Sequence, residues 1–160
     1  MDQTINILFC GIGGQKVLKT SEVCGVAAIA SGYHVRKSET HGMAQRGGSV
    51  ESHLRFGAVV HSPLIMPGSA DFLVCFHAGE AKRLGYFLKP QGIDFSEYLE
   101  YANDLSGPCD SNSLFLGILA AKLSIAIEHW HAALESVMTK NIDENRETFK
   151  RGFQIGKKIF

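Results

Sequence analysis

The N-terminal part of the chain alternates apolar runs with glycine turns. Ile5 to Cys10 is a short apolar run closed by glycine, which predicts a buried strand. Apolar and small residues then recur at helical spacing from Val17 to Ile29, and Ser31-Gly32 predicts the end of this helix. Tyr33 to Ser38 is a second candidate strand. Strand, glycine turn, helix and strand in this order predict the start of a doubly wound sheet.

The middle of the chain carries further strand signals. Apolar and small residues alternate with polar ones from Val50 to Phe56, which predicts a half-buried strand with one polar face. Gly57-Ala58 predicts a hairpin into residues 59–61. Residues 71–76 predict another buried strand, and 78–88 a helix that Pro90 and Gly92 end.

The C-terminal part is helical. Three helices are expected, over residues 112–122, 127–140 and 142–158. In the last one Ile142, Phe149 and Phe153 share a face, and Asn141 with Glu144 forms a capping-box pattern. The expected fold is therefore α/β, with a doubly wound, Rossmann-like, mostly parallel sheet and a helical C-terminal part.

Composition narrows the function classes. The 160 residues suit one domain, expected to span 1–160, and 16 basic against 16 acidic residues argue against nucleic-acid binding. No apolar run approaches the roughly 20 residues of a membrane span, and no leader pattern is evident, so we expect a cytoplasmic protein without membrane contact. The four cysteines are far apart in sequence, which predicts buried free thiols and no metal site.

The neutral total hides a division of charge. Residues 93–110 contain five acidic residues and no basic one, whereas the segments on either side are net positive. Gly92, Gly107 and Pro108 fall in or beside this stretch. We therefore expect 93–110 to be a partly irregular acidic connection between the two halves.

The first glycine turn is a candidate anion site. Gly11, Gly13 and Gly14 precede a predicted helix, whose N-terminal N–H groups can face a phosphate. The dinucleotide fingerprint has a third glycine where this chain has Lys16, so a tight turn without ligand is the alternative. Arg36 and Lys37 lie about twenty residues beyond position 16, where dinucleotide-binding domains carry the residue that contacts the ribose. Basic residues there suit a 2′-phosphate or a coenzyme A phosphate.

A second loop, over residues 38–49, combines polar side chains with glycines. Loops at the carboxyl ends of an open α/β sheet meet, so this loop should adjoin the first turn. Arg46 could clamp an anion, or pair with Glu39 or Glu51. His41 could serve as acid, base or donor, or bond to backbone. We find no nucleophile elbow and no metal-ligand spacing, and therefore no confident catalytic residue.

Two long segments resemble a known family. From Ile7 to about Lys89, and most specifically at HGMAQRGGSV, the chain resembles the gamma-type subunits of 2-oxoacid:ferredoxin oxidoreductases, above all the beta subunits of the indolepyruvate enzymes. The resemblance resumes at Asn112 to Gly117. The chain departs from the family at Lys16, where GGQG is usual, and after Gly92, where its middle part is shorter.

The resemblance implies that this chain is one subunit of an enzyme whose cofactors are bound by another subunit. Such enzymes oxidatively decarboxylate a 2-oxoacid to an acyl-coenzyme A and reduce ferredoxin. Thiamine diphosphate and iron–sulfur clusters would belong to a larger alpha subunit, with coenzyme A as co-substrate, and this chain would be inactive alone. Its expected cofactor-facing residues come from the two loops: Gly11, Gly13, Gly14, Gln15, Thr40, His41, Gln45, Arg46, Gly47 and Gly48. A stand-alone nucleotide-binding oxidoreductase and a scaffold subunit remain alternatives.

Overall fold

The computed structural model describes residues 3–41, 47–105 and 111–160. Strands and helices alternate in the first part and helices follow, as the sequence predicts. In chain order the elements are β1 (Ile5–Ile12), α1 (Val17–Ala30), β2 (His34–His41), β3 (Ser49–Gly57), β4 (Ala70–Cys75), α2 (Ala78–Leu84), η1 (Gly85–Phe87), β5 (Leu88–Asp94), η2 (Phe95–Tyr98), α3 (Leu99–Asn103), α4 (Ser111–Lys122), α5 (Ile127–Val137) and α6 (Ile142–Ile159).

The strands form one sheet in the order β2-β3-β1-β4-β5. β1 pairs in parallel with β4, and β4 with β5, whereas β3 is antiparallel to both β1 and β2. All strands except β3 therefore run in one direction, which confirms the α/β class and the mostly parallel sheet. The first two strands are not neighbours, however, because β3 inserts between them.

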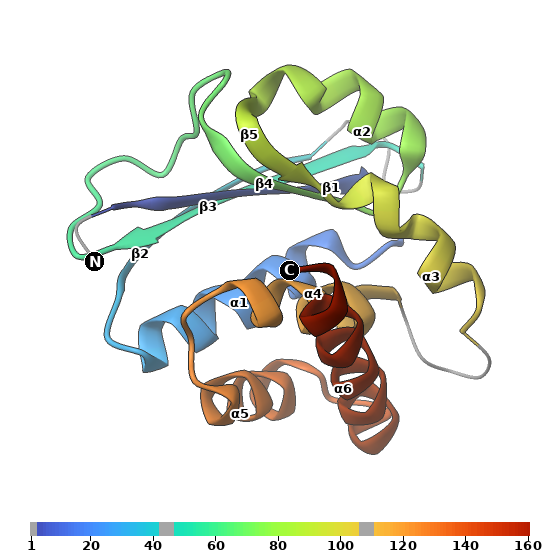
Figure 1. Cartoon of the computed structure of the whole chain (residues 1–160). Helices are drawn as coiled ribbons and strands as arrows, with labels where there is room; N and C mark the ends of the chain where they lie inside the picture. Colours follow the sequence, from blue (N-terminus) through green and yellow to red (C-terminus); the bar gives the residue numbers. More distant parts are fainter. Residues whose placement is uncertain (1–2, 42–46, 106–110) are drawn as a thin grey trace.

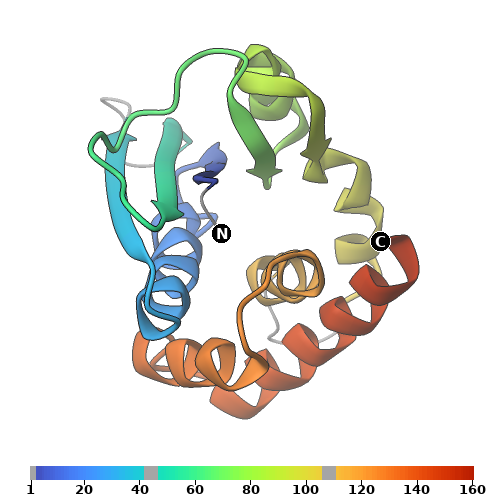
Figure 2. The same ribbon diagram turned by 60° about the vertical axis from the view of Figure 1, so that its left-hand side comes forward.

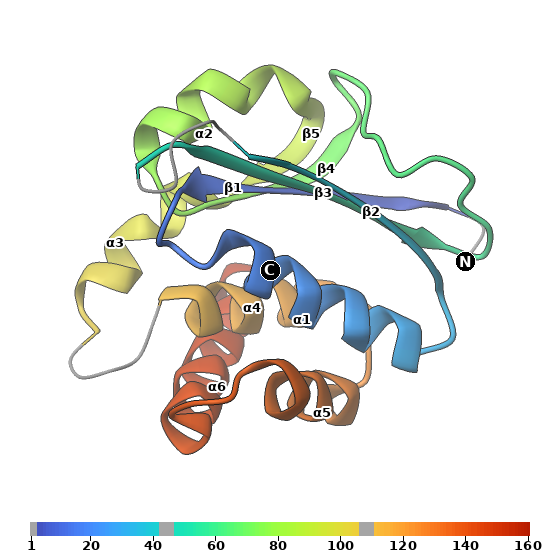
Figure 3. The same ribbon diagram turned by 180° about the vertical axis from the view of Figure 1, so that it is seen from behind.

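Helices cover both faces of the sheet. In Figure 1, α2 lies on one face, α1 and α4 lie on the other, and α5 and α6 form the outermost layer. The same layers are seen from the side in Figure 2 and from behind in Figure 3. Alternation along β1 supplies both cores. Ile7 and Phe9 belong to the cluster under α1 and α4, and Leu8 and Cys10 to the cluster under α2.

Helices α4 and α6 approach each other closely through glycines. A Cβ atom on Gly117 would lie 2.0 Å from the Phe149 carbonyl oxygen, and one on Gly152 would lie 2.0 Å from the Leu114 carbonyl oxygen. Only glycine permits backbones to come this near. Trp130 of α5 is fully buried and packs against Phe149, with ring centroids 6.0 Å apart.

The predicted hairpin after Gly57 is wrong. Residues 58–69 contain no strand and form a loop between β3 and β4. Side chains supply its hydrogen bonds in place of a strand ladder. His34 Nδ1 accepts from Val60 N at 3.1 Å, and Arg55 Nη1 donates to the Ser62 carbonyl at 2.8 Å.

The predicted helix over 78–88 is too long. It ends at Leu84, and β5 begins four residues later with Pro90 inside it. Pro90 is tolerated because β5 is an edge strand, with one side free of ladder bonds. The acidic stretch is partly regular: β5, η2 and α3 extend through it, and Phe95 is fully buried. Residues 106–110 lie outside the described residues.

The capping box predicted at α6 is also wrong. Asn141 is left-handed, with φ 53°, and makes no side-chain cap hydrogen bond. The Asn145 side chain instead donates to the Lys140 and Asn141 carbonyls at 3.1 and 2.9 Å. Ile142 is 38% exposed, so it does not share the buried position of Phe149.

Candidate ligand site at the carboxyl edge of the sheet

Two loops meet at the edge of the sheet where β1, β2 and β4 end. Ile12 pairs with Ser49, and Gly13 N donates to the Gly48 carbonyl at 2.8 Å. The predicted adjacency of the glycine turn and the second loop is thus confirmed for the described end of that loop. Such edges are where α/β proteins bind ligands.

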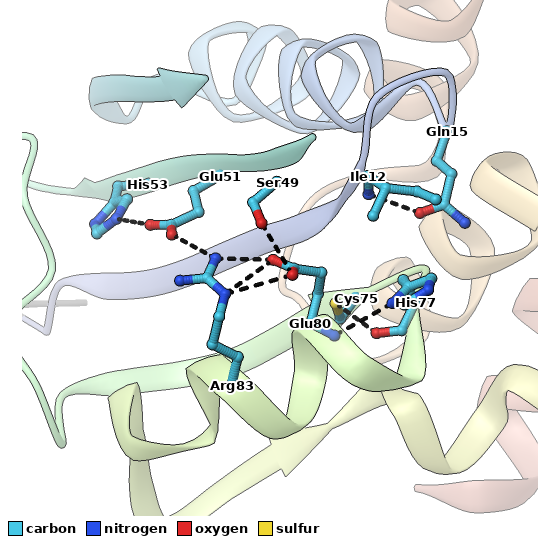
Figure 4. A network of polar contacts seen from close by, with 9 residues as sticks. All are labelled: Ile12, Gln15, Ser49, Glu51, His53, Cys75, His77, Glu80 and Arg83. Carbon is cyan, nitrogen blue, oxygen red and sulfur yellow. Dashed lines mark hydrogen bonds and ion pairs between the residues drawn. The ribbon is translucent and has the colours of Figure 1, made fainter. Parts of the chain in front are cut away.

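Gln15 joins the ends of two strands. Its Oε1 accepts from Ile12 N at 2.9 Å, as Figure 4 shows, and its Nε2 donates to the Phe76 carbonyl at 2.9 Å. Asn112 Nδ2 donates to the Gln15 carbonyl at 2.7 Å and to Thr20 Oγ1 at 2.9 Å, which ties the start of α4 to the same turn. Gln15 is therefore a positioning residue that fixes the turn against β4.

Steric contacts and backbone conformation favour glycine at Gly11 and Gly14, whereas Lys16 occupies a left-handed position of the same turn. A Cβ on Gly11 would lie 2.7 Å from Gln15 Oε1 and 2.9 Å from Val17 Cγ2. Gly14 has φ +95°, and Lys16, which precedes α1, has φ 57°. A left-handed conformation costs a residue with a Cβ roughly 1–2 kcal/mol. This strain explains why a glycine suits the position that Lys16 occupies.

We expect Lys16→Gly to raise the free energy of unfolding by about 0.5–1 kcal/mol. Relief of the left-handed strain exceeds the entropy that glycine adds to the unfolded chain. Urea unfolding followed by circular dichroism measures it. Lys19→Gly, inside α1, is the matched control and should destabilise by about 1 kcal/mol. Equal destabilisation by both substitutions would contradict the prediction.

A cationic hollow of about 340 Å³ lies beside the turn. Its walls include Gly13, Gly14 and Val50, with Lys16 and Lys19 supplying positive charge. Arg36 and Lys37, the predicted phosphate readers, lie elsewhere. Both residues lie in β2, opposite Arg55 and Leu54 of β3 and well before the carboxyl end of β2. Lys37 also forms a 2.6 Å ion pair with Glu39. Lys16 and Lys19 are therefore better candidates for phosphate contacts than Arg36 and Lys37.

A network of charged side chains braces the other side of the edge (Figure 4). Arg83 Nη2 donates to Glu80 Oε2 at 2.8 Å and to Glu51 Oε1 at 2.9 Å, while Ser49 Oγ donates to Glu80 Oε1 at 2.9 Å. The network fixes α2 against the start of β3, directly after the second loop. This network was not predicted from the sequence. The i,i+3 spacing of Glu80 and Arg83 in the helix after β4 could have indicated their ion pair.

Histidines extend this network at both ends. His53, on the strand face predicted to be polar, is 6% exposed, and its Nδ1 accepts from Ile65 N at 3.1 Å. Its proton is therefore on Nε2, which faces Glu51 Oε2 at 3.6 Å. Exposed His77 precedes α2, and its Nδ1 accepts from Glu80 N at 3.3 Å.

The contribution of Glu80 to stability should depend on pH. The Arg83 guanidinium holds the pKa of Glu80 below its ordinary value, assisted by the Ser49 hydrogen bond and opposed by burial. A lowered folded-state pKa stabilises the protein above the unfolded value and loses that effect as pH falls through the folded one. The stability gap between native protein and Glu80→Gln should narrow between pH 6 and pH 3. Urea unfolding across this range tests it, and a constant gap would refute it.

The remaining predicted residues lie at or beyond the end of β2. Thr40 pairs with Glu51, and His41 with Val50, at its last two positions. Gly47 has φ +74° in the turn into β3. Gln45 and Arg46 lie outside the described residues, so their roles stay predictions. Among the described residues, Glu39 pairs with Lys37 and Glu51 with Arg83.

The described cysteines are buried free thiols, as predicted. Burial raises the pKa of both Cys10 and Cys24, and neighbouring Cys75 raises that of Cys10 further. The Cys75 thiol donates to the His77 carbonyl at 3.3 Å. Cys109 lies outside the described residues. Within residues 3–41, 47–105 and 111–160, no group of three His, Cys, Asp or Glu side chains could hold a metal.

The carboxyl edge of this mixed α/β domain combines the glycine turn, the described end of the second loop and a cationic hollow. None of the helices in the described part of the chain has the length and apolarity needed to cross a membrane. The family model for pyruvate ferredoxin/flavodoxin oxidoreductases matches residues 6–97. The chain belongs to this family.

A curated relative is similar in sequence, and a solved structure is similar in fold. Indolepyruvate oxidoreductase subunit IorB of Archaeoglobus fulgidus is 49% identical over 84 residues, 52% of this chain but only 41% of that protein. The keto/oxoacid ferredoxin oxidoreductase gamma subunit of Geobacter sulfurreducens has a similar fold, with TM-score 0.71, 21% identity, and 95% and 98% of the two chains covered.

A third similarity is to part of a longer chain. The 2-oxoglutarate:ferredoxin oxidoreductase of Magnetococcus marinus, solved with 2-oxoglutarate, coenzyme A and succinyl-CoA, matches with TM-score 0.77 and 16% identity. The match covers all of this chain and 32% of that one. The fold therefore occurs both as a chain of similar length and within a larger one.

Proposed function

We propose that residues 1–160 form one gamma-type domain of a 2-oxoacid:ferredoxin oxidoreductase that acts on indolepyruvate or a similar arylpyruvate. Its role is to complete the active-site and coenzyme A region beside a larger subunit in the cytoplasm. One observation carries the proposal. The family match over residues 6–97 contains the whole glycine turn, the second loop and the Glu80–Arg83 network. The substrate class rests on the 49% identity to an indolepyruvate oxidoreductase subunit.

The chemistry that needs thiamine diphosphate and iron–sulfur clusters belongs in this proposal to the larger alpha subunit, which would pass electrons to ferredoxin. The described cysteines do not fit a cluster. Cys10 and Cys75 are buried under α2, whereas Cys24 is buried in the core on the other face of the sheet. A four-iron cluster needs four converging thiolates.

The carboxyl edge fits coenzyme A as a co-substrate. Lys16 and Lys19 line the hollow beside the glycine turn and would hold phosphate oxygens, while exposed Gly14 lets a ligand approach the backbone. Gln15 and the Glu80–Arg83 pair would keep this surface in place. Bound there, coenzyme A would supply the thiol that accepts the acyl group.

Reconstitution tests the proposal. The purified chain alone should not oxidise indolepyruvate when coenzyme A and an electron acceptor are supplied. Co-expression with a larger alpha subunit of this enzyme class should restore the reaction, and activity should be higher with indolepyruvate than with pyruvate or 2-oxoglutarate. Turnover by the isolated chain would refute the subunit role. A micromolar NADP site found by calorimetry would instead favour a stand-alone nucleotide-binding enzyme.

We expect Arg46→Ala to lower kcat/KM of the reconstituted enzyme while leaving the melting temperature of this chain unchanged. The reason is that Arg46 directly precedes Gly47 and Gly48, in a loop whose described end adjoins the glycine turn. Steady-state kinetics with varied coenzyme A measures the effect. Arg36→Ala, remote from the edge, is the matched control. Unchanged kinetics for Arg46→Ala would remove it from the site, and loss of assembly would favour a scaffold role.

A further inference from the structure

The outer helices form an open cavity that lies away from the carboxyl edge. It has a volume of about 550 Å³, within the usual range of small-molecule sites. Its walls come from α5 and α6, the layer farthest from the sheet in Figures 1 and 3. Nothing in the proposed reaction uses this cavity.

One side of the cavity is apolar. Phe149 is fully buried, with its ring centroid 5.5 Å from that of His131, and Phe153 and Ile127 lie beside it. Lys157 Nζ lies 5.6 Å from the Phe153 ring centroid. An apolar ligand body would find contact area here.

The other side contains polar atoms without partners. Among the described residues, three buried side-chain nitrogens lack a hydrogen bond: Trp130 Nε1, His131 Nδ1 and Arg146 Nε. Two of the three belong to the cavity wall, and Trp130 is next to His131 in α5. An unpaired buried polar group costs roughly 1–3 kcal/mol, so its persistence needs an explanation. A hydrogen-bond acceptor brought by a ligand supplies one.

The charges on the wall favour an anionic acceptor. Arg146 and Lys150 line the cavity together with one acid, Glu147, and Arg146 Nη2 also pairs with Glu135. Arginine has five donors, so the Glu135 pair leaves capacity for a second carboxylate. Lys150 is exposed at the rim.

We propose that the cavity between α5 and α6 binds a small carboxylic acid with an apolar body. The carboxylate accepts hydrogen bonds from Arg146 and His131, and the body packs on Phe149 and Phe153. The Arg146 and His131 nitrogens are covered in this structure, so binding includes rotation of these side chains, a common change at binding sites.

Trp130 is the only tryptophan, and its ring centroid lies 6.0 Å from that of Phe149 in the cavity wall, so its emission can report on binding. Titration of the full chain with 3-phenylpropionate should change its emission with saturation and a Kd of about 1 mM or tighter. 3-Phenylpropionamide has the same body without the charge and should bind at least tenfold more weakly. Calorimetry repeats both titrations independently of fluorescence. No saturable binding of the acid, or equal binding of the amide, would overturn the proposal.

Two variants locate the binding. Arg146→Gln should weaken 3-phenylpropionate binding about tenfold, because it removes the charge that faces the carboxylate. It should still fold, since the Arg146 side chain is 42% exposed. Lys158→Gln, on α6 but outside the cavity wall, is the matched control and should bind as the native chain does. Native affinity in Arg146→Gln would place the acid elsewhere and refute the site.

Discussion

Replacing Gly152 with alanine should lower the free energy of unfolding by about 3–5 kcal/mol, enough to unfold much of the protein. The new methyl group would lie 2.0 Å from the Leu114 carbonyl oxygen, far inside contact distance. The obstacle is helix backbone, which cannot rotate aside as a side chain could. Helices α4 and α6 would have to separate, and the buried contacts of Leu114 and Phe149 would be lost with them.

Urea unfolding of the purified chain measures this loss. Gly85→Ala is the matched control, because a Cβ there meets nothing within 4 Å and its backbone is right-handed with φ −56°. It should change stability by less than about 1 kcal/mol. If Gly152→Ala were as stable as Gly85→Ala, the close crossing of α4 and α6 would not exist in solution.

Replacing Gln15 with alanine should lower kcat/KM of the reconstituted enzyme at least tenfold. The side chain is the hydrogen-bonded link between the end of β1 and the carbonyl that follows β4. Without it the glycine turn shifts relative to α2, and a shift of about 1 Å at a reacting site can cost a hundredfold in rate. Two lost hydrogen bonds should also cost about 1–3 kcal/mol of stability.

Kinetics and urea unfolding on the same preparations separate the two effects. Gln91→Ala, at an exposed position of edge strand β5, should leave both unchanged. At saturating coenzyme A, a positioning role predicts a fall in kcat that raising the substrate concentration does not restore. A loss of stability with native kinetics would reduce Gln15 to a purely structural residue.

Local signals in the sequence were sufficient for most elements. The apolar run at Ile5, the helical spacing after Val17 and the left-handed Gly32 each depend on near neighbours, and each is confirmed. The meeting of the two loops also followed from a general rule, because parallel strands end at one edge. These features do not require knowledge of which strands pair.

Features set by distant partners were missed. Val59-Val60 has strand propensity, but His34 and His53 side chains take the hydrogen bonds that a ladder would have used. The pattern of β5 was hidden by Pro90, which an edge strand accepts. Asn141 was expected to cap α6, but its backbone is left-handed and its carbonyl accepts a hydrogen bond from the Asn145 side chain.

In the candidate site too, features set by near neighbours in the sequence could be predicted and features set by distant partners could not. The glycines could be predicted because their backbone requirements are local. The lysines that line the hollow could not be chosen over Arg36 and Lys37, because that choice depends on where along β2 each residue lies. The Glu51–Arg83–Glu80 network joins a strand to a helix across the sheet and becomes visible only in three dimensions.

The central place of β1 has a consequence for how this protein is made. The strand leaves the ribosome before β3 and β4, yet Ile7 pairs with Leu54 on one side and with Phe72 on the other. The apolar residues of β1 therefore have no sheet partners until β3 and β4 have been synthesised. Pairings between residues so far apart close large loops and slow folding. We expect refolding in the millisecond-to-second range and a need for protection of the nascent chain during that interval.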